Sequence, residues 1–245
     1  MQPDPAPYSG AVRTARRLSR VLAGAADRTP RLVYAAAVVP AAVLVIAVVT
    51  QPWVAPTDLV RDGQAVAVLR GTPHASHGLV SNIVILAMAL AAGAALLGAA
   101  AGPSRGDRLR RAVGWGGGIS LVLALDDLLL LHESITVTAW MSKLVVLAYG
   151  LGFAVFLWRF RVEIVRNLDV GLLAIAMLAL GTSALVDAFA APPTVASVLV
   201  EDGAKVLGFA AWCAFLVRGA LVALAPSSAP GPTETAAPVR SRIGA

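Results

Sequence analysis

The sequence has few charged residues, one cysteine and three histidines. Only 14% of its 245 residues are Asp, Glu, Lys or Arg, whereas 58% are hydrophobic. A soluble domain carries about 25% charged residues, so this chain lacks the polar surface that a water-exposed globule needs. The single cysteine, Cys213, excludes a disulfide framework and a cysteine-based zinc site. The composition therefore excludes a soluble enzyme, a disordered chain and a secreted disulfide scaffold.

The hydrophobic residues are grouped in six long apolar runs. Each run approaches the roughly 20 residues that a helix needs to cross a bilayer, and none shows the alternation of a membrane β-barrel. The runs cover residues 31–50, 79–101, 112–131, 140–160, 168–190 and 200–224. We therefore predict an all-α integral membrane protein, a bundle of six transmembrane helices. A basic leader (1–30) precedes the bundle, and a disordered tail (225–245) follows it.

The basic residues are unevenly divided between the two sides of this predicted bundle. Of the 20 Lys and Arg residues, only Arg61 and Arg70 fall outside when the N-terminus is cytoplasmic, while Lys143 and Lys205 lie within spans. Because basic loops stay in the cytoplasm, both termini are predicted to be cytoplasmic, in the cell membrane. The basic side is expected to contact anionic lipids, which accounts for the net charge of +6 without nucleic acid.

Ionisable side chains gather in the outer half of the predicted bundle. Charged groups within a membrane are costly, and they usually mark a functional site. They are Asp126, Asp127, His132 and Glu133 in the third span, Asp187 in the fifth, Glu201, Asp202 and Lys205 in the sixth, and His74 and His77 before the second. We expect these groups to form one polar layer.

Helical geometry predicts how the third span presents its acids. In a continuous helix, Asp126 and Glu133 point within about 20° of each other and lie about 10 Å apart along the axis. Asp127 points about 100° away from Asp126. Asp126 and Glu133 are therefore predicted to face Lys205 and Asp187, whereas Asp127 turns toward the second span or the start of the fourth.

Two segments carry a resemblance to known proteins. DDLLLLHE in the third span and EDGAKVLG in the sixth resemble uncharacterised bacterial multi-pass membrane proteins with DDLxLLHE-like and EDGxKxLG-like segments. SHGLVSN (76–82), followed by an intramembrane aspartate, is loosely similar to the alkaline ceramidase-like membrane hydrolases. The zinc site of those enzymes combines histidines with an aspartate and a serine. They also carry a late histidine pair, whereas no histidine follows His132 here.

Three functions fit the pattern. The first is a metal-dependent hydrolase of a lipid or lipid-linked substrate, in which a divalent ion such as zinc activates a bound water. Its candidate metal ligands are Asp126, Glu133, His77 and His132, and its candidate catalytic residues are Asp126, Asp127, Glu133, Asp187 and Lys205. The second is a structural or assembly protein whose polar layer holds the bundle together, with Glu201 and Lys205 paired along one helix. The third is a proton- or cation-coupled transporter. The sequence leaves the oligomeric state open.

Overall fold

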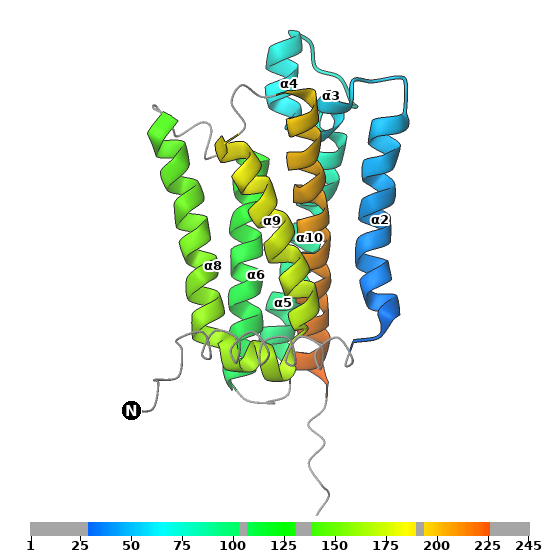
Figure 1. Cartoon of the computed structure of the whole chain (residues 1–245). Helices are drawn as coiled ribbons and strands as arrows, with labels where there is room; N and C mark the ends of the chain where they lie inside the picture. Colours follow the sequence, from blue (N-terminus) through cyan, green and yellow to red (C-terminus); the bar gives the residue numbers. More distant parts are fainter. Residues whose placement is uncertain (1–28, 103–106, 131–138, 190–193, 226–245) are drawn as a thin grey trace, which may run out of the picture.

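The computed structural model describes residues 29–102, 107–130, 139–189 and 194–225, and side chains are not described for 139–143, 146 and 188. Helices account for nearly all of this part of the chain, which contains no strand. The helices are α2 (Arg31–Thr50), α3 (Pro56–Val60), α4 (Gly63–Arg70), α5 (Leu79–Ala101), α6 (Asp107–Leu129), α8 (Ala139–Asn167), α9 (Val170–Phe189) and α10 (Val195–Leu224). The long helices stand side by side, and α3 and α4 cover one end of the bundle (Figure 1).

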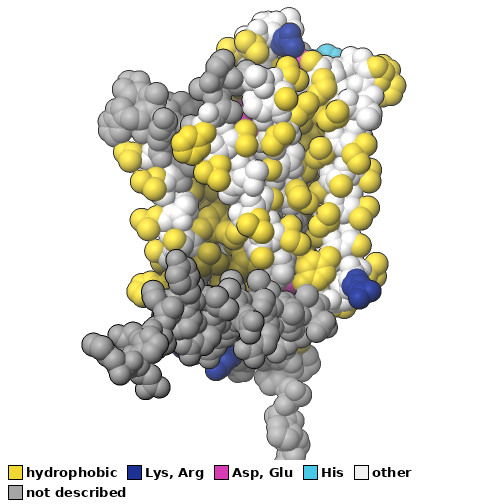
Figure 2. Space-filling view, viewed as in Figure 1, with side chains coloured by type: hydrophobic (Ala, Val, Ile, Leu, Met, Phe, Trp, Pro, Cys, Tyr) yellow, Lys and Arg dark blue, Asp and Glu magenta, His cyan; other side chains and the backbone are white. Residues whose placement is uncertain are grey.

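The long helices have the composition of a membrane bundle. Five of them, α2, α5, α6, α9 and α10, are long and apolar enough to cross a bilayer. Large apolar side chains such as Leu90, Leu97 and Leu178 point outward and are exposed. Hydrophobic side chains cover the sides of the bundle in Figure 2. This surface fits a multi-pass membrane protein, in which exposed leucines would contact lipid rather than water.

Helix α10 lies at the centre of the bundle and contacts α2, α3, α5, α6 and α9. Its side chains Trp212 and Phe215 are fully or almost fully buried, with ring centroids 5.4 Å apart. Phe153 and Phe156 of α8 pack edge-on against the Trp212 ring, at centroid distances of 5.2 and 6.0 Å. Small residues allow close approach elsewhere, since a Cβ at Gly98 of α5 would lie 2.9 Å from the Ala220 Cα of α10.

Two helix boundaries differ from the prediction. Helix α6 ends at Leu129, and Leu130 has a φ of +50°, which breaks the helical path. Glu133 lies outside the described residues, so its position on the face of Asp126 stays a prediction. Helix α8 continues to Asn167, so the break expected at 161–167 is helical. Its length comes from residues that the sequence reading assigned to a basic loop.

A buried carboxylate ties the helices together at the end of the bundle opposite α3 and α4. Asp169 precedes α9 and accepts a hydrogen bond from the Leu172 backbone N–H at 3.2 Å. It also accepts hydrogen bonds from the hydroxyls of Thr29, at 2.5 Å, and Tyr34, at 3.1 Å. The Arg218 Nε of α10 lies 3.2 Å from its Oδ2 atom. One carboxylate thus joins α2, α9 and α10, and the sequence reading did not single it out.

Candidate functional site

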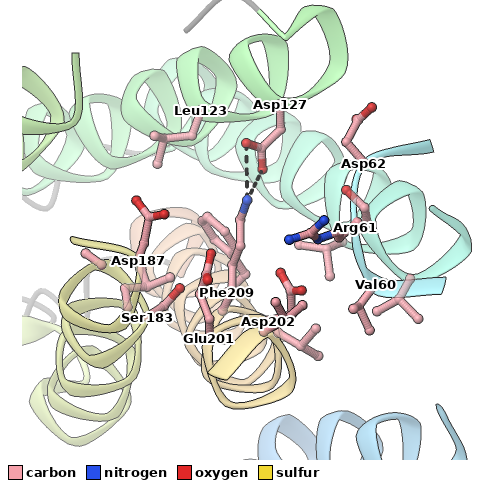
Figure 3. A pocket seen from close by; sticks show the side chains of 18 of the residues that line it. Val60, Arg61, Asp62, Leu123, Asp127, Ser183, Asp187, Glu201, Asp202 and Phe209 are labelled. Carbon is pink, nitrogen blue, oxygen red and sulfur yellow. Dashed lines mark hydrogen bonds and ion pairs between the residues drawn. The ribbon is translucent and has the colours of Figure 1, made fainter. Parts of the chain in front are cut away.

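A polar cavity of about 680 Å³ lies among the ends of α5, α6, α9 and α10, beneath α3 and α4. Its walls are mixed, since valines, leucines and Phe209 alternate with charged groups (Figure 3). The acidic side chains outnumber the basic ones by six to two: Asp62, Asp126, Asp127, Asp187, Glu201 and Asp202 against Arg61 and Lys205. We call this space the polar cavity.

An ion pair between α6 and α10 crosses the polar cavity. Lys205 Nζ lies 3.4 Å from both carboxylate oxygens of Asp127 (Figure 3). The Lys205 side chain is 38% exposed, because it extends into the open space of the cavity. This pairing corrects the prediction that Asp126 faces the lysine. It also shows that Lys205 reaches across to another helix, and no ion pair with Glu201 or Asp202 accompanies it among the described residues.

Three carboxylates form the acidic wall of the polar cavity. Asp187 lies on α9 with Ser183, Glu201 and Asp202 lie on α10, and Asp202 is the one nearest Arg61 (Figure 3). Glu201 lies close enough to Asp187 and Asp202 for mutual repulsion. Among the described residues, none of the three has an ion-pair partner within 4.0 Å. We refer to Asp187, Glu201 and Asp202 as the acidic wall.

Two basic residues, Arg61 and Lys205, partly compensate the charge of the acidic wall. Arg61 follows α3 directly and lines the cavity near Asp202 (Figure 3). Both Arg61 and Lys205 interact electrostatically with Asp202 across the open space. Arg61 and Lys205 also interact with Glu201. The charge on this wall is therefore only partly balanced by the protein.

A clasp between α3, α4 and α5 holds Arg61 over the cavity. The Arg70 guanidinium donates two hydrogen bonds of 3.0 Å to the Asp58 carboxylate, which raises the pKa of Arg70. The Asp58 carbonyl accepts a hydrogen bond from the Gly78 N–H at 2.9 Å. Gly78 has a φ of +66°, which favours glycine, and Gly63 packs against its backbone. These contacts give the segment before α5 a fixed path.

Asp126 occupies a separate place at the edge of the polar cavity. It is 3% exposed and interacts electrostatically with Tyr149 of α8. The two neighbouring aspartates of α6 thus have different partners, as their angular separation predicts. The partner of each was predicted incorrectly, since Asp127 rather than Asp126 turns toward Lys205.

The predicted site residues divide into two groups. Asp126, Asp127, Asp187 and Lys205 come together around the polar cavity, as expected of a shared polar layer. His132 and Glu133 lie outside the described residues. His77 does not line the cavity, and its ring packs 5.7 Å from that of His74. Within the described part of the chain, no group of three or more His, Cys, Asp or Glu side chains could hold a metal ion.

Arg61, Asp62 and Tyr149 are among the cavity-lining residues that were not predicted. Arg61 entered the sequence reading only as a basic residue of the outer side, and Tyr149 appeared to be an ordinary residue of an apolar span. Both line the polar cavity. Arg61 could have been noticed in the sequence, because it is one of only two arginines assigned to the outer side. Nothing in the sequence distinguished Tyr149.

Comparison with known proteins identifies the family of this chain. The model of a domain of unknown function, DUF8692, matches residues 32–219, which include all of the cavity-lining residues. The chain belongs to this family. No curated protein and no solved structure matches the chain. The similarity to alkaline ceramidase-like hydrolases therefore stays a prediction.

Proposed function

We propose that this member of the DUF8692 family binds a ligand with an ammonium group in its polar cavity. The observation that carries the proposal is the acidic wall, a set of three neighbouring carboxylates facing about 680 Å³ of open space. A cation placed between Asp187 and Glu201 relieves their repulsion, and the low dielectric of a membrane protein strengthens each attraction. The role is therefore recognition of an organic cation.

The size and walls of the cavity favour an organic ligand over a bare metal ion. Cavities of about 300–1,000 Å³ with mainly apolar walls and a few polar groups are typical of small-molecule sites. Val84, Leu123 and Phe209 supply such walls here. A metal-dependent hydrolase would need ligands from His132 and Glu133, outside the described residues, because the described residues alone provide no metal group.

The two other predicted functions receive less support. A purely structural polar layer would pair its charges closely, whereas the acidic wall faces an open cavity. A transporter needs a polar route to the other side of the membrane. The buried core below the cavity contains Met88, Phe156 and Trp212, and Ser120 is the one buried polar residue of this region among the described residues. We therefore propose binding at one side of the membrane rather than passage.

The proposed orientation places the polar cavity on the outer side. Helix α8 supplies the sixth crossing in this arrangement, and both termini are cytoplasmic because the basic residues gather at the end opposite α3 and α4. Arg108, Arg159 and Arg161 line a small hollow of about 210 Å³ at that end. We propose that these arginines contact anionic lipid headgroups of the cytoplasmic leaflet.

Binding of a short probe tests the proposed function. We expect butylammonium to bind the purified protein in neutral detergent, as measured by equilibrium dialysis, whereas uncharged butanol does not compete. Glu201→Gln and Asp187→Asn should weaken binding several-fold, because each removes one carboxylate of the acidic wall. Asp107→Asn is the matched control, since this exposed aspartate begins α6 far from the cavity. Equal binding of butanol, or an unchanged affinity in both cavity variants, would contradict the proposal.

Elemental analysis separates this function from the metal-dependent alternative. We expect the wild-type protein and the Asp126→Asn variant to contain no stoichiometric zinc or other divalent metal after purification without chelators. A metal that is present in the wild type and lost from Asp126→Asn would favour the hydrolase.

A further inference from the structure

A second cavity, the apolar groove, runs between α6 and α8. Its volume is about 490 Å³, and its lining is almost entirely apolar. Three glycines, Gly114 and Gly118 of α6 and Gly152 of α8, form much of its wall. A Cβ added at Gly118 or Gly152 would meet no atom within 4 Å. The missing side chains therefore leave real open space along this part of the helix pair.

The way α8 attaches to the bundle explains why the groove stays open. Helix α8 packs mainly against α6, and Phe156, which is fully buried, anchors it beside Trp212. Nearer the outer end, Leu147 and Leu151 are 66% and 63% exposed and point away from the bundle. The two helices are thus joined through aromatic contacts, with glycines rather than large side chains lining the space beside them.

The apolar groove adjoins the polar cavity. Leu123 and Tyr149 line both spaces, so the two cavities share a wall. Tyr149 interacts electrostatically with Asp126 of the polar cavity, and it also borders the apolar groove. The polar cavity and the apolar groove are therefore neighbours across Leu123 and Tyr149.

We infer that the ligand is a cationic amphiphile, with its ammonium group at the acidic wall and its hydrocarbon chain in the apolar groove. This inference rests on the proposed function. It follows from charge and adjacency, because an acidic cavity beside an apolar groove matches a molecule that is cationic at one end and apolar along its length. A hydrocarbon chain gains little hydrophobic energy in moving from lipid to the groove, since both are apolar. The ammonium group of the ligand therefore determines specificity, and the apolar groove accommodates its hydrocarbon chain while the ammonium group is bound.

The test uses hexadecylammonium with a photoreactive diazirine halfway along its chain, at low mole fraction in phosphatidylcholine vesicles that contain the full-length protein. Hexadecanol with the same diazirine is the uncharged control. We expect the ammonium probe to label peptides of α6 and α8 that line the groove several-fold more than the alcohol does. Excess butylammonium should reduce this labelling, because it competes for the acidic wall.

Two glycines of α8 provide a matched pair of variants. Gly152→Leu places a side chain in the groove, whereas Gly150→Leu adds the same side chain two residues away, outside the groove lining. Neither new Cβ meets an atom within 4 Å, so both variants are expected to fold. Gly152→Leu should reduce labelling by the ammonium probe several-fold and leave butylammonium binding unchanged. Gly150→Leu should leave both unchanged.

The outcomes separate the two proposals. Equal labelling by the ammonium and the alcohol, or undiminished labelling of Gly152→Leu, shows that the groove only contacts bulk lipid and overturns the inference. In that case, butylammonium binding to the wild type still supports the proposed function. If butylammonium fails to bind the wild type, the proposed function fails directly, whatever the labelling pattern.

Discussion

Lys205 of α10 and Asp127 of α6 face each other across the polar cavity, with the lysine Nζ 3.4 Å from each carboxylate oxygen. The pair joins helices whose residues are 78 positions apart in the sequence. Its geometry is looser than that of a buried bidentate pair, and the lysine remains partly exposed. It therefore holds two helices together while leaving Lys205 accessible to whatever enters the cavity.

Removal of the lysine charge should destabilise the protein moderately. We expect Lys205→Met to lower the free energy of unfolding by about 1–2 kcal/mol, because Asp127 loses its partner but keeps contact with the open cavity. Thermal unfolding in detergent measures the effect. The double variant Lys205→Met/Asp127→Asn should recover part of the loss, since it removes both charges. If Lys205→Met alone is as stable as the wild type, the pair has no role in stability.

The buried Asp169 should matter more than any exposed acid. It accepts hydrogen bonds from Thr29, Tyr34 and the Leu172 N–H and lies beside Arg218. We expect Asp169→Asn to cost roughly 2–4 kcal/mol, because it breaks a buried charge pair while the amide oxygen keeps some hydrogen bonds.

The control for Asp169 is Asp107→Asn, which changes an exposed residue at the start of α6. This variant should alter the free energy of unfolding by no more than about 0.5 kcal/mol. Thermal or denaturant unfolding in the same detergent compares the two variants. Similar losses for both would show that the cluster around Asp169 does not hold α2, α9 and α10 together.

Two glycines of α5 should respond to alanine in opposite directions. A Cβ at Gly98 would lie 2.9 Å from the Ala220 Cα, so Gly98→Ala should destabilise the α5–α10 contact by about 1–3 kcal/mol. A Cβ at Gly93 meets nothing within 4 Å, so Gly93→Ala should be neutral or stabilising by up to about 1 kcal/mol. Unfolding in detergent checks the ordering. Equal effects would mean that α5 and α10 are farther apart in the membrane.

Cysteine labelling in intact cells tests the orientation. In a Cys213→Ala background, a membrane-impermeant thiol reagent should modify Thr72→Cys, which lies between α4 and α5 at the proposed outer end. It should reach Asp107→Cys only after the cells are permeabilised, because the start of α6 lies at the basic end. The opposite pattern would reverse the proposed topology and place the polar cavity on the cytoplasmic side.

The sequence predicts the long helices well because an apolar run of about 20 residues has few alternatives in a membrane. It predicts the polar layer for the same reason, since charged groups in such runs must gather. The short helices α3 and α4 were assigned to a loop. Their arrangement depends on the pairing of Asp58 with Arg70 and on the Gly78 backbone, which are tertiary contacts that no periodicity records.

The partner of each aspartate could not be read from the sequence, because it depends on how α6 is rotated about its axis. Close packing of glycines sets that rotation. A Cβ at Gly117 would lie 3.1 Å from the Ala95 Cβ of α5, and one at Gly116 would lie 2.7 Å from a Leu216 methyl group of α10. Small residues in the sequence predict that two helices pack closely, but they do not predict which helix packs against them. Asp127 faces Lys205 as a result of these contacts.

The central position of α10 has a consequence for the order in which the protein is made. Asp127 leaves the ribosome 78 residues before Lys205, an interval of roughly 4–16 s at ordinary rates of synthesis. During that interval, α2, α5 and α6 are already available for insertion, yet α2 lacks its main packing partner and Asp127 lacks its cation. The arrival of α10 supplies both at once. A chain interrupted before α10 therefore lacks both the main contact of α2 and the lysine that pairs with Asp127.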